Sequence, residues 1–230
     1  MGIRRVLLKI MILVSVGYAM VCMWHWKIGL TYFTEASNLF VAAAVLVQLP
    51  AGRGRAAQAS SGRPPGFPEI LKYTAVVSVT AAGLAFLFAL APQEPDGFLA
   101  AYRQDHYASL CLHVITPVLS VADFLMNDAG WAWSYRHAVW APLPAAVYFV
   151  WILIMGASGF RWYEGMAAPY GFLNYEAPAG WFGFEPGTVD RTTFGIGVFY
   201  AVLVLLVIFL LLGAAIVAAA RRLSGEGRKG

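Results

Sequence analysis

Residues 192–220 read TTFGIGVFYAVLVLLVIFLLLGAAIVAAA, an uninterrupted stretch without a charged side chain. A helix that crosses the hydrocarbon core of a bilayer needs about 20 consecutive, mostly apolar residues. Four further stretches of this kind lie upstream, at 6–26, 70–92, 107–127 and 137–157. Together they predict a membrane protein built from α-helices.

The composition supports this interpretation. Of the 230 residues, 60% are hydrophobic and 12% are charged, and soluble domains carry about twice that charged fraction. The basic residues behind the net charge of +4 are spread over short loops and tails, which argues against a nucleic-acid partner. Cys22 and Cys111 lie inside apolar stretches, so neither a disulfide framework nor a CxxC metal site is expected.

A sixth span is expected at 32–51, although its apolar part, 39–49, is too short to cross a bilayer alone. The span is long enough only if its first half also lies in the membrane. That half is polar, and polar side chains at such depth are costly and usually functional; they are Thr34, Glu35, Ser37 and Asn38. The whole chain, 1–230, is then a single all-α transmembrane domain of six helices.

The distribution of Lys and Arg predicts the orientation of these six spans. Twelve of the 16 basic residues fall on one side of the alternating spans, and four fall on the other, namely Lys27, Arg103, Arg161 and Arg191. Cytoplasmic loops carry the excess of basic residues. We therefore expect a multi-pass protein of a cell membrane, such as the bacterial inner membrane, with both termini in the cytoplasm.

Two connections differ from the short loops between the other spans. Residues 52–69 are basic and rich in Ser, Gly and Pro, which predicts a flexible cytoplasmic loop. Residues 158–190, between the fifth and sixth spans, form a long outer loop that is rich in aromatic residues. Such a composition is unlike a disordered loop. It fits either a lid over a site or an anchor at the membrane interface.

The fourth expected span carries a row of polar side chains on one face, at helical spacing: His106, Ser109, His113, Thr116, Ser120 and Asp123. Such a row should face protein or water rather than lipid. Asp123 is expected about 15 Å deeper than His113. It is therefore interpreted as a buried hydrogen-bonding group or as a partner of Arg136.

Thr34 and Asn38 share a face of the second expected span, at roughly the depth of His113. A hydroxyl beside an imidazole is the minimal arrangement for nucleophilic catalysis, because the imidazole takes the proton as the oxygen attacks. A threonine in a membrane helix also commonly bonds its own i−4 carbonyl. From spacing alone, a structural role for both residues is therefore the favoured interpretation, and catalysis is the alternative.

Three ordered segments resemble the prokaryotic six-helix membrane protein family over nearly the whole chain. Tyr32 to Leu39, YFTEASNL, is similar to the family's Y-F-T-x-x-S-N-L signature. His113 to Pro117 followed by Asp123-Phe124 resembles its H-x-x-x-P…D-[FW] segment, and Pro169 to Asn174 its P-Y-x-F-[LI]-[DN] segment. These bacterial proteins are in turn distantly similar to the androgen-induced transmembrane threonine hydrolases.

The resemblance implies a membrane-embedded hydrolase of lipid esters, such as fatty-acid esters of hydroxy fatty acids. By its motifs, Thr34 matches the catalytic threonine and His113 the catalytic histidine. The neighbouring polar residues are assigned supporting roles: Asn38, Ser37, Thr116 and Ser109. The third catalytic position stays open between Glu35 and Asp105. The site would lie toward the outer half of the membrane.

This hydrolase would need no cofactor or metal, and its partners would be membrane lipids and an amphiphilic lipid ester. The main alternative is a transporter or a lipid- or ligand-binding membrane protein that uses the same polar residues. A metal or haem site of His25, His106 and His113 is a weaker alternative, since the last two lie about 10 Å apart along a helix.

Overall fold

The structure, a computed structural model, describes residues 2–23, 29–49, 62–188 and 194–225. Within these residues the chain is helical, with an isolated bridge between Phe184 and Ile196 as its one β pairing. The basic loop expected at 52–69 lies outside the described residues up to residue 61, as does His25.

The described residues form long α-helices joined by short 3-10 and π segments. In chain order, they are α1 (Gly2–Met23), η1 (Gly29–Thr31), α2 (Phe33–Gln48), α4 (Phe67–Ala85), η2 (Phe86–Leu90), η3 (Ala91–Gln93), α5 (Phe98–Leu110), η4 (Cys111–Ile115), α6 (Thr116–Asn127), η5 (Tyr135–Trp140), α7 (Leu143–Ala157), η6 (Tyr163–Gly165), η7 (Gly171–Leu173), η8 (Pro186–Thr188) and α8 (Val198–Leu223).

Five helical segments are long and apolar enough to cross a membrane: Val6–Met23, Phe67–Gln93, Phe98–Asn127, Tyr135–Ala157 and Val198–Leu223. Helix α2, with 16 residues, is a shorter apolar helix. It occupies the position where the sequence predicted a span with a polar first half. The all-helical fold with five or six spanning helices is confirmed, whereas the sidedness of the bundle stays a prediction.

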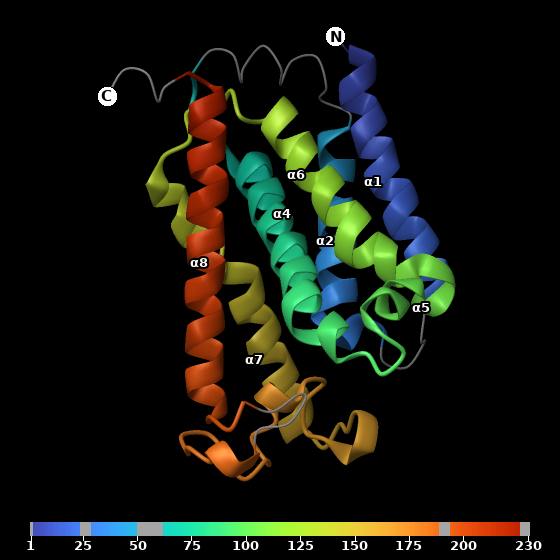
Figure 1. The fold of residues 1–230 in the computed structure, drawn as a ribbon. Coiled ribbons are helices and arrows are strands. Elements are labelled where there is room, and N and C mark those ends of the chain that lie inside the picture. The colour runs from blue at the N-terminus through green and yellow to red at the C-terminus, as the bar shows by residue number, and fades with distance from the viewer. Residues whose placement is uncertain (1, 24–28, 50–61, 189–193, 226–230) are drawn as a thin grey trace.

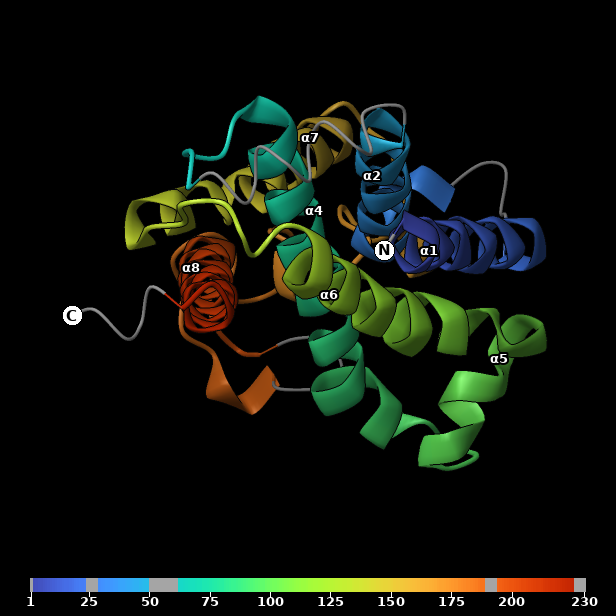
Figure 2. The same ribbon diagram turned by 90° about the horizontal axis from the view of Figure 1, so that it is seen from above.

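The bundle has two distinct ends. Helix α1 begins and α8 ends at one end, here called the terminal end, and the segments between α7 and α8 gather at the opposite loop end (Figure 1). Seen along the bundle, α4 lies among α2, α6, α7 and α8 (Figure 2). Helix α2 packs mainly against α4, and α1 mainly against α6. Because α2 starts near the loop end, its polar first turn lies there.

Close packing inside the bundle depends on small residues. At Gly83 of α4, a Cβ atom would collide with the backbone carbonyl of His113 and crowd the ring of Pro117. At Gly213 of α8, a Cβ atom would meet the hydroxyl of Tyr73. Small residues let helix backbones approach closely, which is the main source of packing energy between helices in a bilayer.

The outward faces of the helices are apolar instead of charged. Helix α8 leaves Leu203, Val204, Val207 and Leu211 exposed along its length. A soluble protein rarely exposes contiguous apolar surface of this extent. The surface is therefore suited to contact with acyl chains.

The fourth span differs from the expected continuous helix. Residues Gln104 to Tyr107 leave helical geometry, and Asp105, His106 and Tyr107 have positive φ angles. The side chain of His106 is exposed, and its backbone carbonyl accepts a hydrogen bond from the Tyr18 hydroxyl at 2.6 Å. The prediction that His106 belongs to the polar row is therefore wrong, and the row begins at Ser109.

A buried network of charges joins three helices toward the terminal end. Asp123 of α6 accepts a hydrogen bond from Lys9 of α1 at 2.7 Å and another from Lys72 of α4. Lys72 also pairs with Asp128, just after α6. Of the two alternatives predicted for Asp123, the buried hydrogen-bonding group is confirmed. The pairing with Arg136 is wrong, because Arg136 is exposed on η5. The lysines reach Asp123 because α1 and α4 both pack on α6.

Candidate active site

The structure brings Thr34 and His113 together at the loop end of the bundle interior. Thr34 lies in the first turn of α2 and His113 in the middle of η4. The Thr34 Oγ1 atom is 3.3 Å from His113 Nε2, although the two residues are 79 positions apart in the chain. Thr34 is half-buried, and His113 is 9% exposed. This is the juxtaposition that the sequence predicted.

The imidazole of His113 is held in one orientation by its other nitrogen. Its Nδ1 atom lies 2.9 Å from the backbone carbonyl of Ser109, and the Ser109 hydroxyl is 3.3 Å away. A carbonyl oxygen accepts but never donates, so the Nδ1 atom must carry the proton. In the neutral ring the Nε2 atom is then a free acceptor that faces the Thr34 hydroxyl.

An aromatic ring fixes the plane of the same imidazole. Phe86 stacks on His113 with ring centroids 3.7 Å apart and an interplanar angle of 12°. The imidazole is therefore held between the stacked ring on its face and hydrogen-bonding groups at both nitrogens. Such support limits the ring to the orientation in which Nε2 meets Thr34.

Both stacked residues lie in π segments, His113 in η4 and Phe86 in η2. Each segment is followed by a proline, Pro117 and Pro92 respectively. Proline cannot donate a backbone hydrogen bond, and its ring clashes with the carbonyl four residues earlier. For Pro117 that carbonyl belongs to His113, and Gly83 leaves room beside it. The wide turn that presents His113 is thus explained by the local sequence, and π segments are frequent at functional sites.

Asn38 links the two segments that carry Thr34 and His113. Its Nδ2 group donates to the backbone carbonyl of Thr34 at 2.8 Å and to that of Leu112 at 3.3 Å. Ser37 donates its hydroxyl to the same Thr34 carbonyl at 3.0 Å. Both residues thus bind the backbone at the site and not the Thr34 hydroxyl. The Oδ1 atom of Asn38 is buried, and no described residue forms a hydrogen bond with it.

Thr116 lies apart from the site. Its hydroxyl is 2.9 Å from the hydroxyl of Ser15, and this pair joins α6 to α1 inside the bundle. Ser120, one turn further along, is fully buried with no partner for its hydroxyl. Of the four residues expected to support the pair, Ser109, Ser37 and Asn38 contact the site, whereas Thr116 serves helix packing.

Neither carboxylate considered for the third position contacts His113. Asp105 is exposed in the break at the start of the fourth span. Glu35 is 9% exposed, and its Oε2 atom has no hydrogen-bond partner among the described residues. Burial raises the pKa of Tyr170 in the loop, and the charge of Glu35 raises it further. The position behind the histidine is occupied by the Ser109 carbonyl. A backbone oxygen carries no side-chain signature, so sequence patterns could not have identified it.

The loop between α7 and α8 packs onto the start of α2. The backbone N–H of Phe33 donates to the Tyr170 hydroxyl at 3.0 Å. Trp162 Nε1 donates to Thr31 Oγ1 at 2.9 Å, and the Tyr148 hydroxyl of α7 donates to the Thr31 carbonyl at 2.7 Å. These aromatic residues are anchored on the segment just before Thr34. The sequence had singled out Tyr170 as part of a motif without giving it a role.

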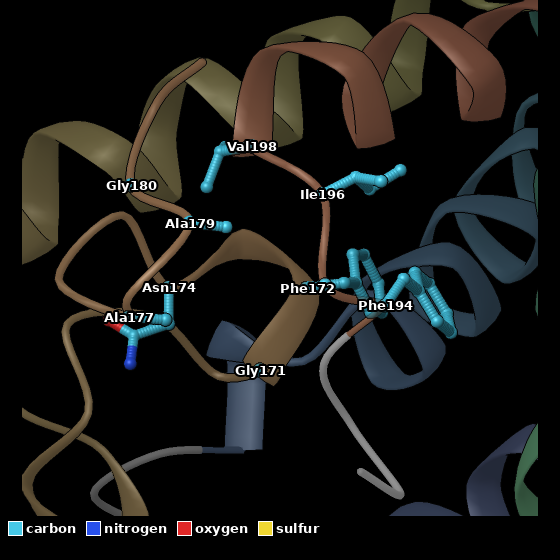
Figure 3. A pocket seen from close by; sticks show the side chains of 10 residues that line it. Gly171, Phe172, Asn174, Ala177, Ala179, Gly180, Phe194, Ile196 and Val198 are labelled. Carbon is cyan, nitrogen blue, oxygen red and sulfur yellow. The ribbon is translucent and has the colours of Figure 1, made fainter. Parts of the chain in front are cut away.

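A small pocket lies in the same loop, beside Tyr170. Its lining includes Phe172, Phe194 and Ile196, with neither Thr34 nor His113 among its residues (Figure 3). Phe172 stacks on Tyr170 with centroids 5.3 Å apart and on Phe194 with centroids 5.4 Å apart. A continuous aromatic stack thus connects this pocket with Tyr170, whose hydroxyl binds the first backbone N–H of α2.

Comparison with known proteins gives no relative: no protein-family model, curated protein or solved structure matches this chain. The case for function therefore depends on the geometry of the site and on the motifs in the sequence. Among the described residues, no group of three potential metal ligands lies together.

Proposed function

We propose that this protein is a membrane-embedded hydrolase of lipid esters, with Thr34 as the nucleophile and His113 as the general base. The observation that supports this proposal most is the 3.3 Å contact between Thr34 Oγ1 and the unprotonated Nε2 of His113. A threonine hydroxyl is a weak nucleophile until an adjacent base removes its proton. The fixed tautomer of His113 supplies that base at the correct atom.

The reaction would proceed in two steps, and in each step His113 returns the proton that it has accepted. Thr34 Oγ1 attacks the ester carbonyl carbon, its proton moves to His113 Nε2, and the carbonyl oxygen becomes negative. Collapse of this intermediate expels the alcohol, which takes the proton from Nε2 and leaves an acyl-threonine. Water then attacks the acyl group with His113 again as base, releasing the acid and restoring Thr34.

The substrate class follows from the surroundings of the pair. Thr34 lies in the first turn of α2 and His113 in η4, and α2 begins near the end of the bundle that carries the aromatic loop (Figure 1). An ester with long apolar chains and a polar junction would suit a site at this depth. The sequence motifs narrow the proposal to fatty-acid esters of hydroxy fatty acids.

The excess of basic residues at the terminal end would place that end in the cytoplasm and the loop end, with the site, on the outer side. Labelling with a membrane-impermeant thiol reagent in intact cells tests this orientation. In a background with Cys22 and Cys111 replaced by Ala, a cysteine at position 176 should react and one at position 60 should not. The reverse pattern would contradict the proposed sidedness.

The catalytic proposal is tested with the purified protein in detergent or vesicles. We expect Thr34→Ala and His113→Ala each to abolish hydrolysis of a lipid ester, and the double variant to be scarcely worse, because the two residues act as a unit. Thr34→Ser keeps the hydroxyl and should retain part of the activity. A fluorophosphonate probe should label the wild type and fail on Thr34→Ala.

A Thr34→Ala variant with native unfolding behaviour that still hydrolyses the ester at the wild-type rate would contradict this proposal. Wild-type protein that neither hydrolyses lipid esters nor reacts with the probe would contradict it as well. The same polar residues would then be assigned to holding a bound lipid or transported ligand.

A further inference from the structure

The hydroxyl of Tyr170 lies at the start of α2, beside the turn that carries Thr34, although it comes from the loop and not from a span. It accepts a hydrogen bond from the backbone N–H of Phe33, the residue before Thr34, at 3.0 Å. The ring is held on two sides, by Phe172 in a stack and by Tyr32 edge-on at 5.8 Å. The position of the hydroxyl is thus fixed independently of Thr34.

The hydrogen bonds at Tyr170 and Thr34 can be assigned a donor and an acceptor each. Because the oxygen accepts from the Phe33 N–H, its own proton is available to donate. The Thr34 hydroxyl donates to His113 Nε2, so Thr34 Oγ1 is left as an acceptor for Tyr170. Burial raises the pKa of the Tyr170 hydroxyl above the usual value for tyrosine, so the hydroxyl keeps its proton at neutral pH. The Tyr170 proton is thus available to an acceptor that forms beside Thr34.

We propose that Tyr170 is a further catalytic residue that donates a hydrogen bond to the oxyanion formed when Thr34 attacks the ester. This inference rests on the proposed function and adds the group that the pair lacks. When Oγ1 bonds to the carbonyl carbon, it becomes an ester oxygen and a poorer acceptor. The negative oxygen forms two bonds away from Oγ1, and the Tyr170 O–H donates a hydrogen bond to it. No proton leaves Tyr170 in this step.

Two features favour this role over a purely structural one. A donor aimed at developing negative charge in a water-poor site is the commonest source of large rate effects in acyl transfer. The bond from the Phe33 N–H, at the positive end of α2, also makes the Tyr170 hydroxyl a stronger donor. A residue that only capped α2 would need the oxygen of Tyr170 and would have no use for its proton.

The test replaces Tyr170 by Phe, which removes the hydroxyl and keeps the ring in both of its aromatic contacts. We expect kcat to fall about 30- to 300-fold with KM changed less than about 3-fold, because the lost bond forms in the transition state. The rate of labelling by the fluorophosphonate probe should fall by a similar factor. Tyr163→Phe is the matched control, since Tyr163 lies in the same loop with 71% of its surface exposed, and it should behave as the wild type.

A structural role would give a different pattern. If Tyr170 only caps α2, Tyr170→Phe would lower the unfolding midpoint, and kcat in the folded fraction would stay at the wild-type value. That result, or wild-type labelling of Tyr170→Phe, would overturn the inference while the loss of labelling in Thr34→Ala upheld the Thr34 nucleophile. Wild-type protein that is inert to both ester and probe would overturn the two proposals together.

Discussion

Asn38 holds two backbone segments together with a single amide group. Its Nδ2 atom donates to carbonyls of α2 and of η4, and these segments carry Thr34 and His113. The distance between the two catalytic candidates therefore depends on a residue that touches neither reacting atom. Ser37 provides the natural comparison, because it donates one bond to the Thr34 carbonyl and none to η4.

We expect Asn38→Ala to lower the free energy of unfolding by about 1–2 kcal/mol, since it leaves the buried carbonyl of Leu112 without this donor. Probe labelling of Thr34 should slow as well, because η4 is less firmly held. Ser37→Ala should cost less than about 1 kcal/mol and leave labelling near the wild-type rate. Equal effects of the two variants on labelling would argue against the linking role of Asn38. Unfolding in mixed micelles and labelling time courses supply both measurements.

At the scale of helices, the wide turn of η4 and the small residue opposite it form one unit. Pro117 frees the His113 carbonyl from the helix ladder, and Gly83 of α4 leaves space for that carbonyl. Gly17 of α1 is a useful contrast, because a Cβ atom there would meet nothing within 4 Å. The same substitution should therefore have opposite effects at the two positions.

We expect Gly83→Ala to destabilise the protein by about 1–3 kcal/mol, because the added methyl group forces α4 away from the fourth span. Gly17→Ala should stabilise it by up to about 1 kcal/mol, since alanine loses less backbone entropy in a helix. Lipid-ester hydrolysis should fall in Gly83→Ala and be unchanged in Gly17→Ala. A Gly83→Ala protein as stable as the wild type would show that the close approach is not needed. Thermal unfolding and activity assays on the two variants are the measurements.

The polar row on the fourth span was predictable because helical spacing alone places Ser109, His113, Thr116 and Ser120 on one face. The break at Gln104 to Tyr107 was not. Its positive φ angles fall on Asp, His and Tyr, and no glycine marks the position. The sequence also contained both members of the candidate pair, since motif and depth agreed on Thr34 and His113. The proton on Nδ1 of His113 is assigned from the contact with the Ser109 carbonyl. A backbone contact of this kind can be seen only in a structure.

At the scale of the whole molecule, the charge network joins parts of the chain that the sequence could not pair. Lys9 and Asp123 are 114 positions apart, and Lys72 and Asp128 are 56 apart. The nearest basic residue after the fourth span, Arg136, was the obvious candidate by distance along the chain. Asp123 pairs with the lysines because α1 and α4 pack on α6. Contacts between distant helices of this kind produce no recognisable pattern in the local sequence.

We expect Asp123→Ala to destabilise the bundle by about 3–5 kcal/mol, because it leaves Lys9 with only the uncharged Gln48 as a described partner and Lys72 with one carboxylate of two. Arg136→Ala should change the unfolding free energy by less than about 0.5 kcal/mol, since its side chain is exposed. Unfolding titrations of the two variants under one condition give the comparison. A larger loss in Arg136→Ala than in Asp123→Ala would contradict the network.

The charge network also has a consequence for how the protein is made. A nascent chain that ends before Asp123 contains both lysines and neither of their carboxylates. As the ribosome delivers α1 and then α4 to the translocon, each helix enters the membrane with an ammonium group in its first turns, where the cost is below the roughly 2–3 kcal/mol of a lysine at the helix centre. That cost is relieved only when α6 emerges. We therefore expect the early helices to stay beside the insertion machinery until the fourth span arrives, and chains truncated before it to be degraded faster than the full-length chain.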